Sequence, residues 1–415
     1  MKNYKGSELS KLKDVSKRDF LKVTKQYGLT SAMIALGGLS GAVTLPQLAQ
    51  ATENTYRKRY RQTPLHQLKF GGSGHTELSQ RIEKSGCFQF IKDLEERTNG
   101  AIRIEFFGAN SLCNQGTCVK KTQQGIVDIF LASTQNSAGG APYFNVLDFP
   151  YMFPNRAALY HFFYSKQSEK LLRAPLRKLH KLEFLFSHAE LRSLMLGSKW
   201  KDKPTVTSVS ELAGTKNRVT GTQLGRIAMT LMELNPVPIA WSETLDGLKQ
   251  GLIDGAETWS SAAAFANMAP VISQDVQLKF FAGTQATSMR SQVFDQLSSD
   301  LQNDVMESSY TSQIWVQGHN EAALATMTGA TNPQLPGTVY AQNNVRVADL
   351  SMAALKEAEE MCSPKYNPKE WEKWRDRLNK MSGGQDVYKE ISSVANEVSI
   401  DEKAIHVLPS RWWKS

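Results

Sequence analysis

Two hydrophobic patterns alternate along the first half of the chain. Residues 67–70 alternate apolar and polar side chains before a glycine-rich segment, which predicts a strand that ends in a loop. Apolar residues then recur at helical spacing over 76–97. A strand over 101–107, a helix that ends at Gly125 and an apolar strand over 126–131 are expected next. This order predicts an α/β lobe with a mainly parallel sheet.

The same order of elements returns later without sequence repetition, which predicts a second α/β lobe. The expected strands are 216–220, 237–240 and 252–256, and the expected helices are 225–234 and 242–250. Ligands of such sheets bind beyond the carboxyl ends of strands. The segments 71–75 and 133–137 are therefore candidate pocket loops.

The C-terminal part is expected to be mainly helical, with helices at 301–325, 345–361, 368–381 and 387–398. The segment 194–208 contains Pro204 and several lysines, so a surface hairpin or loop is expected there. These patterns predict three regions: a first lobe at 66–190 with part of 280–330, a second lobe at 191–279 with part of the C-terminal region, and helices at 331–415 that brace the lobes.

The amino-terminal residues carry the pattern of an export signal. Residues 16–22 read SKRDFLK, which differs from a twin-arginine motif by a lysine in the first position. An uncharged stretch over 26–51 follows and closes with a small-x-small cleavage pattern, Ala49-Gln50-Ala51. A membrane anchor is the alternative, but glycines and hydroxyl residues make the stretch weakly apolar. We expect residues 1–51 to direct export to the periplasm and to be cleaved after Ala51, with the twin-arginine and general secretory routes both open.

Charge argues against nucleic-acid binding. The whole chain has a formal net charge of +9, and residues 1–51 hold eight Lys and Arg against three Asp and Glu, which leaves about +4. Much of this remainder is a basic cluster within 52–65, which is expected to be a solvated tether. The folded part is thus nearly neutral, and no nucleic-acid partner is expected. Its length suits two lobes.

The cysteines suggest one disulfide and no metal site. Cys113 and Cys118 bracket a turn-prone loop, so a disulfide is favoured over two free thiols. Cys87 lies on an apolar helical face and is expected to be a buried thiol. No Cys-x-x-Cys or His-x-x-x-His spacing occurs, so neither a metal nor another cofactor is expected.

The most informative segment combines an arginine with an acidic glycine turn. Arg218 lies on a short predicted strand about 40 residues before Asp254-Gly255-Ala256-Glu257. The planar guanidinium of arginine matches a carboxylate through two parallel hydrogen bonds. In an exported chain without catalytic signatures, this arrangement indicates capture of a small organic anion.

Five segments resemble, in order, motifs of the DctP family, the extracytoplasmic solute receptors of tripartite ATP-independent periplasmic (TRAP) transporters. They are 95–107, 125–129, 147–153, 211–219 and 235–257. The resemblance covers about residues 66–330. It implies a two-lobe α/β solute-binding fold with a ligand cleft between the lobes. It also implies an organic acid as ligand and the membrane subunits of a TRAP transporter as partners.

The resemblance implies roles for two arginines. Arg218 occupies the position of the carboxylate anchor of the family. Arg192 lies where the family often has a second arginine, although no glycine precedes it here. A pocket role and a structural salt bridge, with Glu190 as its neighbour, are equally supported for Arg192.

Five further residues complete the candidate site. Thr258 stands where the family commonly has asparagine, and Trp259 follows it, which favours a less polar or differently shaped carboxylate. Glu257 is expected to hold the hinge rather than to contact the ligand. Glu77 and Gln135 lie on the candidate pocket loops.

Two rival functions use the same fold. An enzyme would need a nucleophile with a base or paired carboxylates of unlike pKa, and the chain has no Gly-x-Ser-x-Gly, phosphate-loop or dinucleotide pattern. A sensor that presents bound solute to a signalling partner would use the same pocket. A receptor for transport, not an enzyme, is the expected function.

Overall fold

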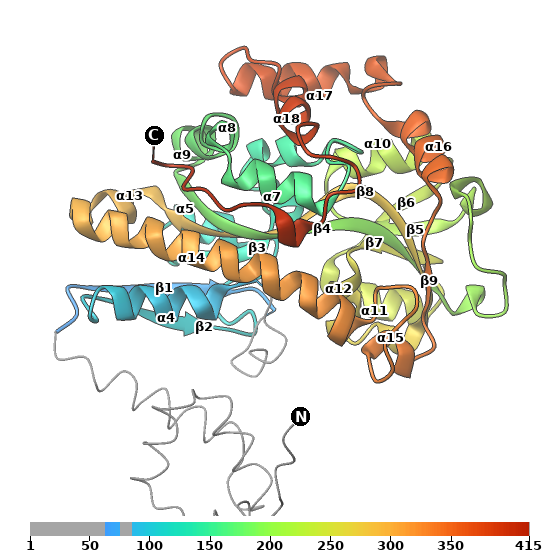
Figure 1. The fold of residues 1–415 in the computed structure, drawn as a ribbon, viewed down its shortest axis with the longest axis horizontal. Helices are drawn as coiled ribbons and strands as arrows, with labels where there is room; N and C mark the ends of the chain where they lie inside the picture. Colours follow the sequence, from blue (N-terminus) through green and yellow to red (C-terminus); the bar gives the residue numbers. More distant parts are fainter. Residues whose placement is uncertain (1–62, 75–84, 415) are drawn as a thin grey trace, which may run out of the picture. The chain divides into compact units, whose positions relative to one another are not determined.

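Two long antiparallel strands, β4 (Leu182–Gly197) and β8 (Ile272–Arg290), form the centre of the fold in the computed structural model, which describes residues 63–74 and 85–414 (Figure 1). They lie within one mixed sheet whose order is β2-β1-β3-β8-β4-β7-β5-β6, with β9 paired to β8. The other strands are β1 (His66–Gly72), β2 (Ile102–Phe107), β3 (Ile129–Ser133), β5 (Lys216–Val219), β6 (Asn235–Pro238), β7 (Gly255–Thr258) and β9 (Arg346–Ala348).

The α-helices of the described residues are α4 (Cys87–Arg97), α5 (Cys118–Gln123), α6 (Thr134–Ser137), α7 (Arg156–Tyr164), α8 (Lys166–Ser168), α9 (Ala174–His180), α10 (Gln223–Leu231), α11 (Trp241–Lys249), α12 (Ser260–Phe265), α13 (Ser291–Asp295), α14 (Ser299–Ala323), α15 (Val339–Gln342), α16 (Met352–Cys362), α17 (Pro368–Met381) and α18 (Val387–Ala395). A 3-10 helix, η3 (Pro142–Leu147), and a π-helix, η8 (Leu324–Thr328), are also used below.

The outer strands of the first lobe are parallel, as predicted. β1 pairs in parallel with β2 and β3, and β3 then meets the C-terminal half of β8 in antiparallel register. All five residues of β3 are buried, which explains its unbroken apolar sequence. Cys87 is buried on α4, as expected from its place on the apolar helical face.

The second lobe repeats the arrangement at the other end of the long strands. β5 pairs in parallel with β6 and β7, and β7 pairs in antiparallel register with the C-terminal end of β4. The expected strands and helices of this lobe are present, with bounds shifted by a few residues. β5 and β7 therefore bring their carboxyl ends to the same edge, close to β4.

The pairing of β4 with β8 is interrupted where the two lobes join. Arg192 pairs with Phe281 and Leu194 pairs with Val276, so a single residue of β4 faces residues 277–280 of β8. The enlarged loop is a β-bulge in which the backbone bends and its hydrogen bonds are redirected. Tyr151 holds this loop, because its amide donates to Phe280 O at 2.8 Å and its hydroxyl donates to the carbonyl of Leu278 at 3.1 Å.

Helix α14 is the long element that connects the lobes. It has 25 residues, packs against α4 and β4, and continues into η8, which packs against α12 of the second lobe (Figure 1). The expected helix at 345–361 is wrong at its start, because 346–348 form β9 and only α16 is helical there. Pairing with residues 274–276 of β8 satisfies this backbone, so tertiary contact decides its conformation.

The expected surface hairpin at 194–208 is wrong for its first four residues. β4 continues to Gly197, and all 16 of its residues are buried. A central strand covered on both faces shows little alternation, so its pattern resembles that of other apolar segments. Cys113 and Cys118 form a disulfide with an S–S distance of 1.99 Å.

Candidate ligand-binding site

Two arginines from different strands converge on Glu257 at the carboxyl end of β7. Arg192 of β4 donates from Nη1 to Glu257 Oε1 at 2.7 Å, and Arg218 of β5 has its Nη1 3.8 Å from Glu257 Oε2. The three side chains are only 1–2% exposed. Burial of two guanidiniums against one carboxylate creates a site with a strong demand for further negative charge.

Arg218 is held in place by hydrogen bonds to backbone carbonyls, and Glu257 is the one carboxylate near it among the described residues. Its Nε donates to the carbonyl of Ile239 and its Nη1 to that of Glu257, both at 3.1 Å, while the Trp241 ring centre lies 5.4 Å from Cζ. No described residue accepts a hydrogen bond from its Nη2. Burial lowers the pKa of Arg218 to about 10, with Glu257 acting in the opposite direction. The guanidinium is therefore held in place through Nε and Nη1, and its Nη2 is not taken up by any residue that the structure describes.

Arg192 contacts both lobes. Its Nη2 donates to Ser133 Oγ at 3.2 Å at the end of β3, and its Cζ lies 4.6 Å from the ring centre of Trp259. The salt bridge that it makes is with Glu257, not with the neighbouring Glu190. The sequence suggested Glu190, on the same strand, as the salt-bridge partner of Arg192, whereas in the structure the partner is Glu257 of β7.

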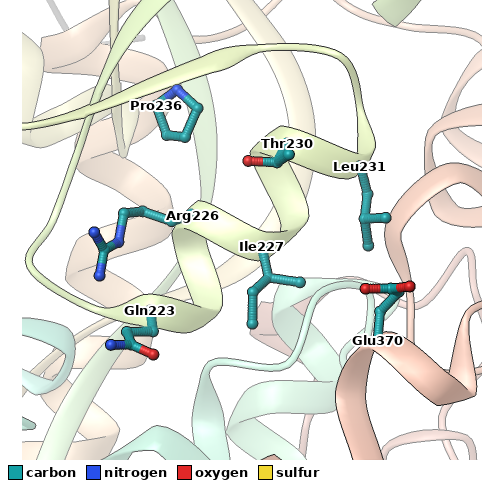
Figure 2. A pocket seen from close by; sticks show the side chains of 7 residues that line it. All are labelled: Gln223, Arg226, Ile227, Thr230, Leu231, Pro236 and Glu370. Carbon is teal, nitrogen blue, oxygen red and sulfur yellow. The ribbon is translucent and has the colours of Figure 1, made fainter.

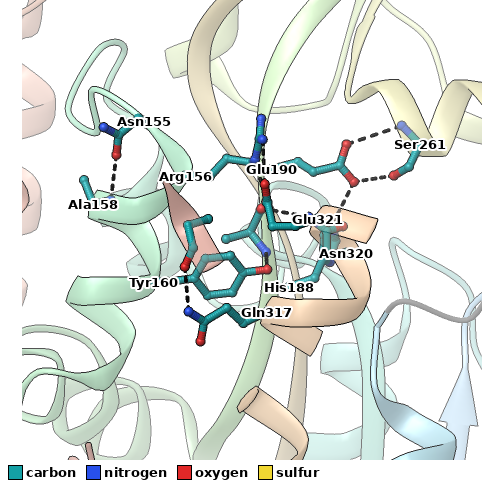
Figure 3. Close-up of polar contacts among 12 residues, drawn as sticks. Asn155, Arg156, Ala158, Tyr160, His188, Glu190, Ser261, Gln317, Asn320 and Glu321 are labelled. Carbon is teal, nitrogen blue, oxygen red and sulfur yellow. Dashed lines mark hydrogen bonds and ion pairs between the residues drawn. The ribbon is translucent and has the colours of Figure 1, made fainter. Parts of the chain in front are cut away.

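Glu190 belongs to a separate polar network beside the site. Its carboxylate accepts hydrogen bonds from the hydroxyl and the backbone amide of Ser261 at the start of α12. Close to Glu190, Arg156 of α7 forms a two-point ion pair with Glu321 of α14, with both distances 2.7 Å (Figure 3). Asn320 of α14 also donates to the carbonyl of Ala189 at 3.2 Å. These contacts hold the segment of β4 that carries Arg192.

A hydrogen bond joins the two lobes across the site. Thr220, directly after β5, donates through its hydroxyl to Gln135 Oε1 on α6 at 3.0 Å. Gln135 thus lies in the site region that its loop position predicted. Thr258 is buried at the end of β7, and Trp259 follows it. Glu77 lies outside the described residues.

Asp148, which lies directly after η3, is a further residue near the site that was not among the predicted site residues. Its side chain is fully buried, and neither carboxyl oxygen has a hydrogen-bond partner among the described residues. Burial raises the pKa of Asp148 to about 8; Arg192 lowers the pKa, Glu257 raises it, and the nearby Gln135 amide lowers it. The one available signal was an acidic residue inside an otherwise apolar run, Leu147-Asp148-Phe149.

Gln115 is a second residue that sequence reasoning missed. It lies in the loop closed by the Cys113–Cys118 disulfide, and its Oε1 accepts a hydrogen bond from the Ser133 amide at 2.7 Å. Ser133 is the residue that contacts Arg192. The disulfide loop therefore supports the candidate site through one intermediate residue.

The side chains of the site are suited to holding an anionic ligand. The site offers two fixed cations, an aromatic ring and amide and hydroxyl groups, which are the groups that orient an anionic ligand. Among residues 63–74 and 85–414, no three His, Cys, Asp or Glu side chains converge as metal ligands. No described helix is long and apolar enough to cross a membrane.

A separate groove lies away from these residues, between α10 and α17. Its volume is about 390 Å³, and Figure 2 shows its lining residues: Gln223, Arg226, Ile227, Thr230, Leu231, Pro236 and Glu370. None of the predicted site residues that the structure describes lines it. Arg192, Arg218 and Glu257 instead meet near the carboxyl ends of β5 and β7.

The fold and the buried cation cluster define a two-lobe periplasmic binding protein. The chain belongs to the bacterial extracellular solute-binding protein family 7, DctP, whose sequence profile matches residues 73–372. The relatives and structural neighbours described below are named as binding proteins.

Two curated relatives illustrate the range of similarity. The 2,3-diketo-L-gulonate-binding periplasmic protein YiaO of Escherichia coli is 25% identical over 194 residues, which cover 46% of this chain and 55% of that protein. The C4-dicarboxylate-binding periplasmic protein DctP of Rhodobacter capsulatus is 22% identical over 308 residues, or 73% and 85% of the two chains. The first of these alignments thus spans little more than half of the relative.

Solved structures share the fold over nearly their whole length. A TRAP periplasmic solute-binding protein from Sulfitobacter with bound β-D-galacturonate has a TM-score of 0.64 at 19% identity, covering 79% of this chain and 99% of its own. One from Desulfovibrio salexigens with bound orotic acid has a TM-score of 0.65 at 17% identity, covering 80% and 99%. At these identities the similarity establishes the fold alone.

Proposed function

We propose that this protein captures a small organic acid between its lobes and delivers it to the membrane subunits of a TRAP-type transporter. The observation that carries the proposal is the pair of buried guanidiniums of Arg192 and Arg218 around the single carboxylate of Glu257. An incoming carboxylate would supply the missing negative charge and accept from the Nη2 of Arg218, which donates to no described residue. Solved relatives with bound galacturonate, galactonate and succinate support an acid as the ligand class.

Lobe closure is the proposed mechanism of capture. The lobes correspond to 66–190 and 191–279, with later segments added to each and with 331–415 as the brace. The interrupted pairing opposite residues 277–280 is the proposed hinge, because backbone there is free of the regular ladder. Closure excludes water, which strengthens an Arg–carboxylate pair. Micromolar to nanomolar binding requires about 8–12 kcal/mol, so aromatic and hydrogen-bond contacts must add to that pair.

Export is proposed to follow the amino-terminal signal, with cleavage after Ala51 and with residues 52–65 as a tether. Amino-terminal sequencing of the periplasmic protein is expected to begin at or near Thr52. Protein found only in the membrane fraction would contradict cleavage.

A binding screen tests the proposed ligand class. The mature protein is incubated with galacturonate, galactonate, pantoate, acetolactate, succinate and orotate, and melting temperature and calorimetric binding are measured. At least one acid is expected to raise the melting temperature, because ligand binding stabilises the folded state by mass action. The absence of binding by every member of this panel would contradict the proposed ligand class.

Substitution of Arg218 tests the anchor. Arg218→Ala is expected to weaken binding of the best acid by about 2–5 kcal/mol, and Arg218→Lys is expected to weaken it markedly because the planar fork is lost. Arg192→Ala is the comparison and is expected to weaken binding less, since Arg192 already has a carboxylate partner in Glu257. If Arg218→Ala remains folded and binds within roughly threefold of the parent, well short of that cost, Arg218 is not the anchor.

A further inference from the structure

The buried carboxyl group of Asp148 makes no ion pair with a residue that the structure describes. It lies directly after η3, is fully buried, and neither oxygen makes a hydrogen bond to a described residue. The groups that act on it are the Gln135 amide of α6, the Arg192 guanidinium of β4 and the Glu257 carboxylate of β7. Arg192 is already paired with Glu257 at 2.7 Å. We call Arg192, Arg218, Glu257 and Asp148 the cluster. Asp148 is its second carboxyl group, and the guanidinium that acts on it, that of Arg192, is already bound to Glu257.

The charge of the cluster depends on the proton of Asp148. Arg192 and Arg218 contribute two positive charges, and Glu257 contributes one negative charge. If Asp148 is ionised, the cluster is neutral and offers no net attraction to an anion. If Asp148 is a neutral acid, the cluster carries one net positive charge, which one carboxylate of a ligand neutralises. A doubly charged acid would bring one buried negative charge without a partner, which is costly.

Burial favours the neutral acid. A carboxylate that is removed from water is destabilised relative to its protonated form, and for Asp148 the nearby Gln135 amide offsets only part of this effect. The pKa of Asp148 is raised to about 8, chiefly by burial, so the acid form predominates at neutral pH. The neutral group can also donate a hydrogen bond, which an ionised carboxylate cannot.

We propose that Asp148 is held as a neutral acid and that this restricts the site to singly charged carboxylates. The inference rests on the proposed function and narrows its ligand class. It also links binding to a proton. Asp148 loses its proton as the pH rises, and the net charge of the cluster then falls from +1 to zero. An anion that binds at high pH therefore requires Asp148 to take up a proton.

The size of this pH effect follows from the population of the acid form. With a pKa of about 8, roughly one molecule in ten retains the proton at pH 9, and apparent affinity scales with the competent fraction. Binding of a singly charged acid is therefore expected to weaken about tenfold between pH 7 and pH 9. Asp148→Asn keeps the shape of the side chain but cannot ionise, so its affinity is expected to stay nearly constant over this range.

The binding experiment compares charge classes in the full mature protein. Pantoate and galactonate serve as singly charged probes and succinate as the doubly charged probe, with calorimetry at pH 7 and pH 9 in buffers of different ionisation enthalpy. Wild type is expected to take up a proton with either singly charged acid at pH 9, and Asp148→Asn is not. Asp246→Asn, an exposed change on α11, is the matched control and is expected to follow wild type. Succinate is expected to bind at least about tenfold more weakly than the better singly charged acid at pH 7.

A second measurement needs no ligand. The melting temperatures of wild type and Asp148→Asn are compared from pH 6.5 to pH 9.5. Wild type is expected to lose stability relative to the variant as the pH rises to about 8, and the difference is expected to level off above it. If the variant does not fold, proton uptake by wild type supplies the same information.

The outcomes separate this inference from the proposed function. Tight binding of succinate with no proton uptake would overturn the role of Asp148 while leaving an acid receptor in place. Failure of all three acids to bind would count against the proposed function, and the ligand-free comparison would still decide the protonation of Asp148. A difference in melting temperature that does not change with pH would overturn the neutral acid.

Discussion

Glu257→Gln is the substitution that tests whether the two buried arginines depend on one carboxylate. The amide has nearly the same shape, so the change removes charge and leaves packing almost intact. Arg192 and Arg218 are 2% and 1% exposed, and both face Glu257. Removal of one partner of a buried ion pair costs about 3–5 kcal/mol, because the remaining charge stays buried without compensation.

This loss corresponds to a measurable change in melting temperature. The unfolding entropy of about 350 ordered residues is roughly 0.7 kcal/mol/K, so the expected decrease is about 4–7 °C in the absence of ligand. A saturating acid supplies the missing negative charge. The ligand-induced increase in melting temperature should therefore be larger in Glu257→Gln than in wild type.

Asp93→Asn is the control. Asp93 pairs with Arg97, and their side chains are 20% and 34% exposed, so solvent screens the charge that remains and the expected cost is below about 1 kcal/mol. Differential scanning fluorimetry with and without the best acid of the screen measures both variants. A Glu257→Gln protein that melts within 1 °C of wild type would refute the reasoning, as would a ligand response no larger than that of the control.

Two further predictions concern groups around the site. Burial raises the pKa of Asp275 to about 6, while hydrogen bonds from Ser260 and Tyr340 lower it. The protonated Asp275 side chain therefore contributes fully to folding stability below its unfolded pKa of about 3.8, and this contribution is lost as the pH rises through 6. Asp275→Asn should therefore gain on wild type by about 2–3 kcal/mol between pH 4 and pH 7, and chemical denaturation that gives a constant difference would contradict this. Gln115→Ala removes the acceptor of the Ser133 amide, so acid binding is expected to weaken by about 1 kcal/mol; calorimetry showing unchanged affinity alongside a lower melting temperature would indicate a purely structural role.

Sequence patterns predicted the outer parts of both lobes well. Alternating and helical periodicities indicated β1, β2 and the helices between the strands, because each of these elements buries one face that its own residues define, and a short apolar run indicated the fully buried β3. The same patterns missed the length of β4 and β8. Both strands are buried on both faces for most of their length, so they lack the alternation that identifies a strand, and their pairing joins residues about 100 positions apart.

The candidate site shows the same division. Local motifs determined which arginine and which acidic turn to consider, since Arg218 and Glu257 sit in recognisable segments of the sequence. Only the tertiary structure decided that Arg192 pairs with Glu257 rather than with Glu190, and that Asp148 joins their cluster. The net charge of a buried cluster depends on which charged side chains are packed next to one another, away from water. That juxtaposition is set by the long-range pairing of β4 with β7 and β8, which no local pattern of residues specifies.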